Sequence, residues 1–185
     1  MIMWILLAIV VIIAIWFAAA YNAFVRLTQR VKEAWSDIDV QLKRRYDLVP
    51  NLVETVKGYA AHEAGTLQKV TEMRTRAMNA TAPADKAEAE NMLSGALKSL
   101  FAVSENYPNL KANENFLELQ RQLEDTENKL QAARRFYNSV VQDLNTKLQS
   151  FPSNFVGNMF GFKSADFFQL GDADAAAKEP VKVQF

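Results

Sequence analysis

The chain has 185 residues, and its 21 Lys and Arg residues balance its 21 Asp and Glu residues, so the formal net charge is zero. Because nucleic-acid-binding proteins normally carry a basic excess, this balance argues against DNA or RNA as a partner. The absence of cysteine excludes disulfides, zinc thiolates, iron–sulfur clusters and cysteine nucleophiles, and a single histidine leaves little scope for histidine-based metal or triad chemistry.

Residues 1–21 form the first predicted element, with the sequence MIMWILLAIVVIIAIWFAAAY and no charge, glycine or proline. At about 1.5 Å of rise per helical residue, about twenty such residues span the ~30 Å hydrocarbon core of a bilayer. The run therefore predicts a transmembrane anchor. Ala18-Ala19-Ala20 also resembles the cleavage site of a signal peptide, but no basic residue precedes the apolar run, so we expect the anchor to be retained.

Basic residues follow this anchor and none precedes it. Arg26, Arg30 and Lys32 lie within a dozen or so residues of its end. By the positive-inside rule, the N-terminus is expected outside and the C-terminal domain in the cytoplasm.

Residues 22–150 are predicted to be a helical bundle that continues directly from the anchor. Pro50 has no N–H and disfavours the helical conformation of Val49, so we expect the first helix to end or kink near Asp47 and a second to begin at Pro50. The alternative is a kinked continuation that leaves three longer helices. The apolar stripe of the first helix recurs at steps of three and four residues: Phe24, Leu27, Val31, Ala34 or Trp35, Ile38 and Leu42.

The remaining helices have clearer ends. The second should end near Asn79, the third should run from Asp85 to the turn before Pro108, and the last should end near Ser150. The last helix carries a stripe with the spacing of coiled-coil packing: Phe116, Leu119, Leu123, Thr126, Leu130, Ala133, Tyr137, Val140 and Leu144. The pattern predicts an all-α protein in which the transmembrane helix continues into an antiparallel, up-and-down four-helix bundle.

Residues 151–185 form an aromatic-rich C-terminal segment and tail. The segment either caps the open end of the bundle or packs on lipid or a neighbouring subunit. Residues 181–185 alternate like a strand and could add to a partner's sheet. The candidate interface aromatics are Phe155, Phe160, Phe162, Phe167 and Phe168.

Polar residues on or beside the apolar stripes form a candidate patch for pairing between helices or for recognising a partner. We expect Arg44 or Arg45 to pair with Glu127, because such pairs set the register of packed helices. The patch comprises Arg44, Arg45, Asp47, Asn51, Glu54, Glu63, Glu127, Arg134 and Asn138.

No catalytic, cofactor-binding or metal-binding residue is expected. His62-Glu63 suggests a zinc protease, but a zincin needs a second histidine four residues after the first, and that position holds Thr66. The Glu-x-x-His pairs of a two-metal bundle are absent from the sequence as well.

The stretch RRYDLVPNLVETVKGYAAHE, residues 44–63, closely resembles the signature of the LemA family of bacterial membrane proteins. Supporting matches are AWSDIDVQLK (34–43), YPNLKAN (107–113), TENKLQAARRFYN (126–138) and FPS (151–153). The resemblance implies a single-pass protein of the bacterial inner (cytoplasmic) membrane with a cytoplasmic four-helix domain. It implies no reaction. Relatives are often encoded beside membrane metalloproteases, which suggests such a protease as a partner.

The sequence therefore favours a non-enzymatic scaffold or adaptor that binds the lipid bilayer through its anchor. It would act by homo-oligomerisation or by interaction with another membrane protein. One alternative is a regulator or adaptor of a membrane protease. The other is a sensor or enzyme that holds a small molecule inside the bundle, which would need a polar-lined cavity.

Overall fold

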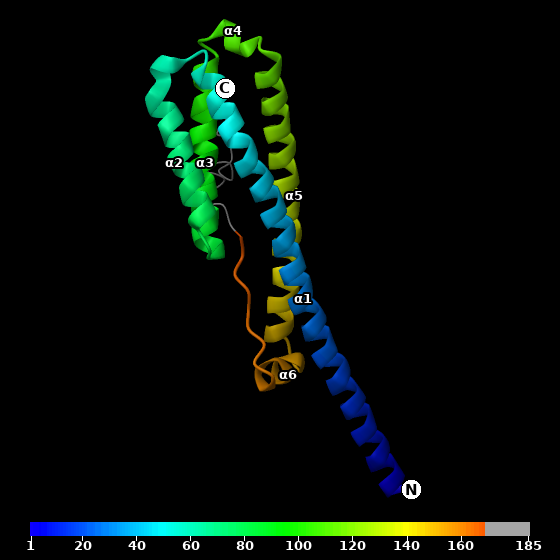
Figure 1. Ribbon diagram of the computed structural model, residues 1–185. Coiled ribbons are helices and arrows are strands. Elements are labelled where there is room, and N and C mark those ends of the chain that lie inside the picture. The colour runs from blue at the N-terminus through cyan, green and yellow to red at the C-terminus, as the bar shows by residue number, and fades with distance from the viewer. Residues whose placement is uncertain (169–185) are drawn as a thin grey trace, which may run out of the picture. The chain divides into compact units, whose positions relative to one another are not determined.

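The computed structural model describes residues 1–168, and these form helices and turns with no strand (Figure 1). The all-α expectation is confirmed for this part of the chain. The predicted strand at residues 181–185 lies outside it. The helices are α1 (Ile2–Lys57), the 3₁₀ helix η1 (Ala61–Glu63), α2 (Ala64–Asn79), α3 (Pro83–Ser104), α4 (Pro108–Lys111), α5 (Glu114–Gln149) and α6 (Ser153–Met159).

Packing divides these elements between two compact units. The first unit contains Met1–Asp37 and Ala133–Asp166, and therefore includes the N-terminal part of α1, the C-terminal part of α5, and α6. The second contains Ile38–Ala132 and, among the described residues that follow Asp166, Phe167 and Phe168. Helices α1 and α5 thus contribute to both units.

Helix α1 continues through Pro50. The favoured expectation, in which a second helix begins at Pro50, was therefore wrong, and the alternative of a continuation through the proline holds at this position. A proline inside a helix leaves the carbonyl four residues earlier without its usual N–H donor, here the carbonyl of Tyr46. The Nε of Arg74, on α2, donates a hydrogen bond of 2.7 Å to this oxygen. Since the orphaned carbonyl has a partner from another helix, the chain does not need to leave the helix at the proline.

The chain leaves α1 at Gly58 instead, which divides the predicted second helix of residues 50–79 into two parts. Glycine is about 1 kcal/mol less favourable than alanine inside a helix, so Gly58 is a weak point in the pattern. The N–H of Ala60 closes the end of α1 on the carbonyl of Val56 at 2.8 Å, and Ala60 itself is fully buried. Helix α2 then ends at Asn79, as predicted.

In the second unit, α2 and α3 lie side by side (Figure 1). Helix α3 begins with Pro83 in its first turn, where a missing N–H costs nothing. The side-chain oxygen of Asn113 accepts a hydrogen bond of 3.0 Å from the N–H of Phe116 and so caps the start of α5. Buried apolar side chains of this unit come from every long helix: Ile38, Leu42, Val49, Leu52, Val56, Leu67, Val70, Leu93, Leu97, Leu100, Leu110, Phe116, Leu123 and Leu130.

In the first unit, α6 packs against α1 and α5. Ala20 and Phe24 of α1 form a buried cluster with Leu144 of α5 and Val156 of α6. Gly157 lets α6 approach closely, because a Cβ at that position would lie 2.7 Å from the Cδ2 of Leu148 and 3.3 Å from the Cζ of Phe24. The absence of a side chain at residue 157 is therefore part of how this unit packs.

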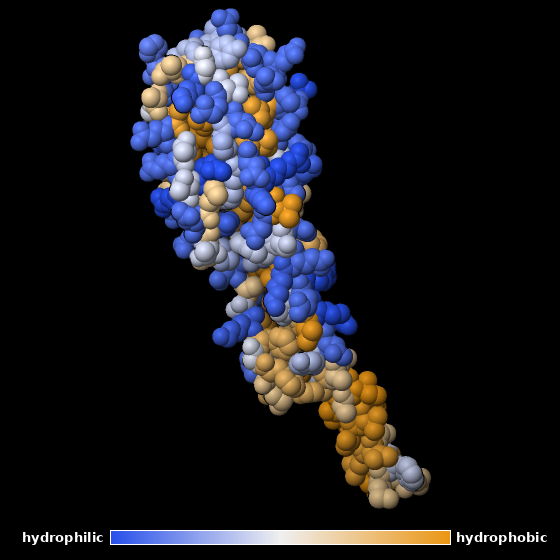
Figure 2. Space-filling model, viewed as in Figure 1, coloured by the Kyte–Doolittle hydropathy of each residue, from blue (hydrophilic) through white to orange (hydrophobic). Residues whose placement is uncertain are grey.

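The N-terminal part of α1 is exposed. It contains an 18-residue window with a mean hydropathy of 3.0, none of which is buried within the protein, and by length and composition it could cross a membrane. Figure 2 shows this stretch as a continuous hydrophobic surface.

Candidate functional site

The most unusual group of side chains is a buried ionic cluster in the second unit, made by Arg45 and Tyr46 of α1 with Glu90 and Ser94 of α3. The side chains of Arg45 and Glu90 are only 6% and 1% exposed, and the Nη1 of Arg45 lies 3.0 Å from the Oε2 of Glu90. The Nη2 of Arg45 donates to the Oγ of Ser94 at 2.7 Å. The hydroxyl of Tyr46 donates to the second oxygen of Glu90.

Helical periodicity brings these groups together. Arg45 and Tyr46 follow Leu42 by three and four residues, so they share the buried face of α1. Glu90 precedes Leu93 by three residues on the buried face of α3. The cluster therefore occupies core positions that apolar residues would otherwise fill.

Burial is the main influence on the protonation of this cluster. It raises the pKa of the Glu90 carboxyl above its usual range, although Arg45, the Tyr46 hydroxyl and Lys86 act in the opposite direction. Burial and the neighbouring Glu90 raise the pKa of Tyr46 as well, so the phenol stays a neutral hydrogen-bond donor. Both carboxylate oxygens of Glu90 have a hydrogen-bond partner, one in Arg45 and the other in the Tyr46 hydroxyl. Such pairing is what a buried structural cluster requires.

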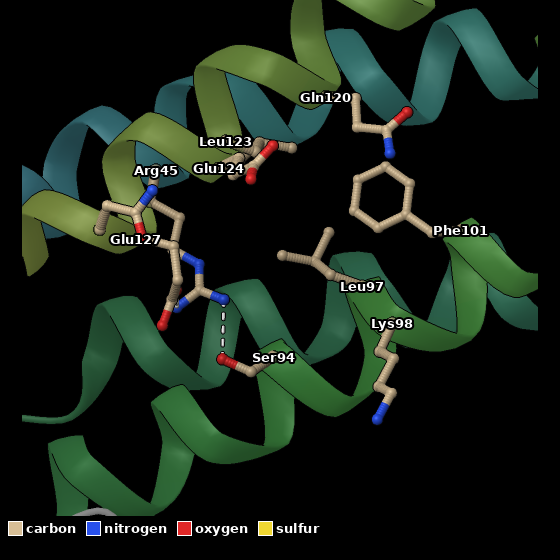
Figure 3. Close-up of a pocket in the computed structure, with 10 residues that line it drawn as sticks. Arg45, Ser94, Leu97, Lys98, Phe101, Gln120, Leu123, Glu124 and Glu127 are labelled. Atoms are coloured by element: carbon tan, nitrogen blue, oxygen red, sulfur yellow. Dashed lines mark hydrogen bonds and ion pairs between the residues drawn. The ribbon is translucent and has the colours of Figure 1, made fainter. Parts of the chain in front are cut away.

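The cluster borders an open groove of about 500 Å³ between α3 and α5 (Figure 3). The groove has apolar walls from Leu97 and Phe101 of α3 and Leu123 of α5, with Arg45 and Glu127 at one end. Charged Lys98 and Glu124 complete its lining, together with Ser94, Gln120 and Asn128. Apolar walls with charges around them suit the side chains of a partner helix or peptide.

The pairing expected from the sequence is present for Arg45, whose Nη1 lies 3.3 Å from the Oε2 of Glu127. Glu127 is one-third exposed, so this arm of the cluster reaches the groove. Arg44 pairs instead with Asp125 at 3.5 Å, and both side chains are almost half exposed. The Lys129 ammonium hydrogen-bonds to Asp125 at 2.8 Å and, with Arg44 nearby, lowers the pKa of that carboxyl.

The other candidate polar residues do not join this cluster. Asp47, Asn51 and Glu54 are exposed on α1, and Glu54 pairs with Lys57 at 3.4 Å. Glu63 accepts a hydrogen bond of 3.2 Å from the hydroxyl of Tyr107.

Arg134 and Asn138 belong to the first unit, so the candidate patch is distributed over both units. His62 is exposed in η1, next to Glu63. Within residues 1–168, no group of three or more His, Cys, Asp or Glu side chains could hold a metal ion.

The candidate aromatics also divide. The Phe160 ring lies 4.7 Å from the Tyr21 ring, and the Phe162 ring stacks on Phe24 at 5.0 Å, so both pack on α1 in the first unit. Phe155 is 66% exposed. Phe168 is buried and Phe167 is more than one-third exposed.

Sequence reasoning missed Glu90, Tyr46 and Arg74. For Glu90 a signal was available, because positions 90, 93, 97 and 100 form an apolar stripe with one carboxylate in it. For Tyr46 and Arg74 the informative contacts come from residues 44 and 28 positions away, which no local pattern reveals.

The LemA family model matches residues 34–185, a range that includes the whole buried cluster. Protein LemA of Metamycoplasma hominis is 27% identical over 157 residues, covering 83% of this chain and 70% of that protein. Magnetosome protein MamQ 2 of Paramagnetospirillum magneticum is 25% identical over 175 residues, and MamQ of Magnetospirillum gryphiswaldense is 23% identical over 174. Each of these two matches covers 80% of this chain and 64% of the relative, so the chain spans about two thirds of their length.

Proposed function

This chain belongs to the LemA family, and from that premise we propose that it is a non-enzymatic, single-pass membrane protein that acts as a scaffold or adaptor. It would work by assembling with itself or with other membrane proteins. The observation that carries the proposal is the continuity of α1, which runs as one helix from Ile2 to Lys57. A single helix thus contains both the apolar run and residues of the core of the second unit.

Two features support a retained membrane anchor. The first is the bare apolar surface of α1, with no buried residue in its most hydrophobic window. The second is the packing of Ala20 with Phe24, Leu144 and Val156. Cleavage after Ala18-Ala19-Ala20 would remove Ala20 from this cluster, whereas an uncleaved anchor keeps it intact.

The proposed orientation places the N-terminus outside and the remaining domain in the cytoplasm, in the inner membrane of a bacterium. Arg26, Arg30 and Lys32 support it, because all three are exposed on α1 after the apolar run.

We also propose that the polar helices form an antiparallel, up-and-down four-helix bundle. Contacts within the second unit support this, since Arg45 of α1 bonds to α3 and α5 while Arg74 of α2 bonds to α1. Short connections between α1 and α2 and between α2 and α3 favour antiparallel neighbours.

The groove beside Arg45 supports the role in assembly. The half-buried Phe101 offers apolar contact above the buried Leu97 and Leu123, and Lys98 and Glu124 offer charges that would select a partner. The names of the compared relatives, LemA and magnetosome protein MamQ, are not names of enzymes, which agrees with a structural role.

The test is crosslinking of the full chain in intact membranes followed by purification under denaturing conditions. A self-assembling scaffold returns mainly crosslinked copies of itself, and an adaptor returns a second membrane protein in stoichiometric amount. A return of a membrane protease in that amount would favour the regulator role. Recovery of uncrosslinked chain alone, with a monomer by light scattering at all concentrations, would refute the proposal.

A matched pair of variants would locate the contact. Lys98→Glu reverses a charge at the groove, whereas Lys69→Glu makes the same change at an exposed position of α2 that does not line it. We expect crosslinking to fall for Lys98→Glu and to be unchanged for Lys69→Glu. Equal effects of the two substitutions would place the contact elsewhere.

A further inference from the structure

Helix α6 and the turn before it expose three large apolar side chains. Phe151, Phe155 and Met159 are 80%, 66% and 70% exposed. Phe155 and Met159 are about one helical turn apart on α6, and the Phe151 ring in the preceding turn lies 6.2 Å from the Phe155 ring, so the three form a single stripe. We call these three residues the interface stripe. Val156 and Gly157 of the same helix are buried against α1 and α5. This very short helix is therefore apolar on both its packed and its open side.

The contacts of α6 place it at the end of the apolar run of α1. The Phe160 ring, directly after α6, lies 4.7 Å from the Tyr21 ring and 5.8 Å from the Phe17 ring. Phe17 and Tyr21 are separated by one helical turn, or about 6 Å along the helix axis. Tyr21 is also the last residue of the uncharged stretch of α1. Figure 2 shows the surface at α6 as apolar, next to the hydrophobic surface of α1.

Charged groups begin at the same level. Arg26 follows Tyr21 by little more than one turn, and the Lys147 ammonium at the end of α5 lies 5.6 Å from the centre of the Phe24 ring. Aromatic rings followed by cationic side chains are typical of segments at the boundary between acyl chains and phospholipid headgroups. The order of groups along α1 is thus apolar run, aromatic cluster, then cations.

We propose that α6 lies in the membrane–water interface, with the interface stripe inserted among the phospholipids beside the end of the α1 span. The lipid is chosen as the occupant because the stripe is continuous, through Phe160, with the part of α1 that would cross the bilayer. The inference rests on the proposed function, since it requires α1 to span the membrane. It adds a second lipid contact, from a segment more than 120 residues away in the sequence.

Spin labelling tests this directly, because the chain has no cysteine of its own. The full chain, with a nitroxide on Phe155→Cys or Met159→Cys, would be reconstituted into vesicles of phosphatidylcholine and phosphatidylglycerol. The relative accessibility of each label to oxygen, which partitions into lipid, and to a polar nickel complex would be measured. Two labels on α1 supply references: Ile12→Cys in the apolar run, where residue 12 is 65% exposed, and Gln29→Cys at an exposed polar position two turns beyond Tyr21.

We expect the oxygen-to-nickel ratio at residues 155 and 159 to lie several-fold above that at Gln29 and closer to that at Ile12. A water-like ratio at both positions, with a lipid-like ratio at Ile12, would overturn the inference and leave the membrane span standing. A water-like ratio at Ile12 would remove the span and the proposed function with it. Shielding from both reagents, with magnetic broadening between labels, would overturn the inference by showing that a second copy covers the stripe.

A further variant tests whether the stripe itself drives insertion. Phe155→Ser combined with Met159→Ser removes two of its three apolar groups, both of them exposed. A label at Phe151→Cys should then shift toward the water-like ratio, while circular dichroism stays unchanged. An unchanged lipid-like ratio at residue 151 would show that the stripe does not hold the segment in the interface.

Discussion

Replacing Glu90 by alanine tests how the buried ionic cluster contributes to stability. The substitution removes the carboxylate that lies 3.0 Å from Arg45 and leaves the guanidinium only 6% exposed. Breaking a buried ion pair by removing one partner typically costs about 3–5 kcal/mol, because the remaining charge is buried without compensation. Glu127, at 3.3 Å, and Ser94, at 2.7 Å, still contact Arg45. We therefore expect the free energy of unfolding to fall by about 3 kcal/mol, the lower end of that range.

The assay is urea unfolding of the full chain in detergent micelles, followed by far-ultraviolet circular dichroism. Arg44→Met is the matched control, because Arg44 is adjacent in sequence but almost half exposed. Its pair with Asp125 should contribute less than about 1 kcal/mol.

A triple variant separates the cost of an orphaned charge from the net value of the cluster. Arg45→Met, Tyr46→Phe and Glu90→Leu together remove three of the cluster's four polar groups, keep similar volumes and leave the Ser94 hydroxyl in place. Replacing a buried ion pair by apolar residues is often neutral or stabilising, so the triple variant should be more stable than Glu90→Ala alone. The reasoning fails if Glu90→Ala costs no more than Arg44→Met. It also fails if the triple variant loses as much free energy of unfolding as the three single substitutions lose in sum.

Three further outcomes follow from the same structure. Arg74→Met should lower the free energy of unfolding in urea by about 1–2 kcal/mol, because the Tyr46 carbonyl loses its donor. In a Pro50→Ala background residue 50 supplies an N–H to that carbonyl, so the same substitution should cost clearly less. Equal costs in both backgrounds would contradict this role of Arg74. Gly157→Leu should lower the thermal unfolding midpoint more than Gly65→Leu does, because a Cβ at residue 157 would lie 2.7 Å from Leu148 and 3.3 Å from Phe24, whereas one at residue 65 would meet no atom within 4 Å. For pH, burial raises the pKa of Glu90 in the folded state, so the folded protein binds this proton more tightly than the unfolded chain does. The stabilisation linked to this proton is full below the unfolded pKa near 4.5 and is lost as the pH rises through the folded value, separately from the cost of leaving Arg45 unpaired in Glu90→Ala. The free energy of unfolding relative to Glu90→Gln should therefore fall with rising pH, and a difference that grew with pH would refute the direction.

Local sequence patterns predicted the features that depend on neighbouring residues. The stripe of the last helix is buried at Phe116, Leu123, Leu130 and Val140, among others. The end of α5 at Gln149 lies one residue from the predicted position. Such features depend on helical periodicity and on prolines that stop a helix, both of which are visible in a short window.

The errors have a common physical cause. At Pro50 the local preference favours a break, and it is overridden by a hydrogen bond from Arg74, which is 28 residues from Tyr46. Of the buried ionic cluster, only the ion pair between Arg45 and Glu127 was predicted, because the main carboxylate of the cluster, Glu90, is 45 residues from Arg45. Contacts of this kind depend on how helices pack, so a single sequence read by periodicity does not contain them.

The cluster of Ala20, Phe24, Leu144 and Val156 also has a consequence for biosynthesis. Its last member to be synthesised, Val156, lies 132 positions after Phe24. At a translation rate of roughly 5–20 residues per second, Phe24 would wait about 7–26 s for its partner to be made. Until Leu144 and Val156 are made, the part of the ring that they cover has only lipid, a chaperone or water to contact. The growing chain therefore passes through a stage in which its first helix is complete while the hydrophobic surface next to its apolar run is still uncovered.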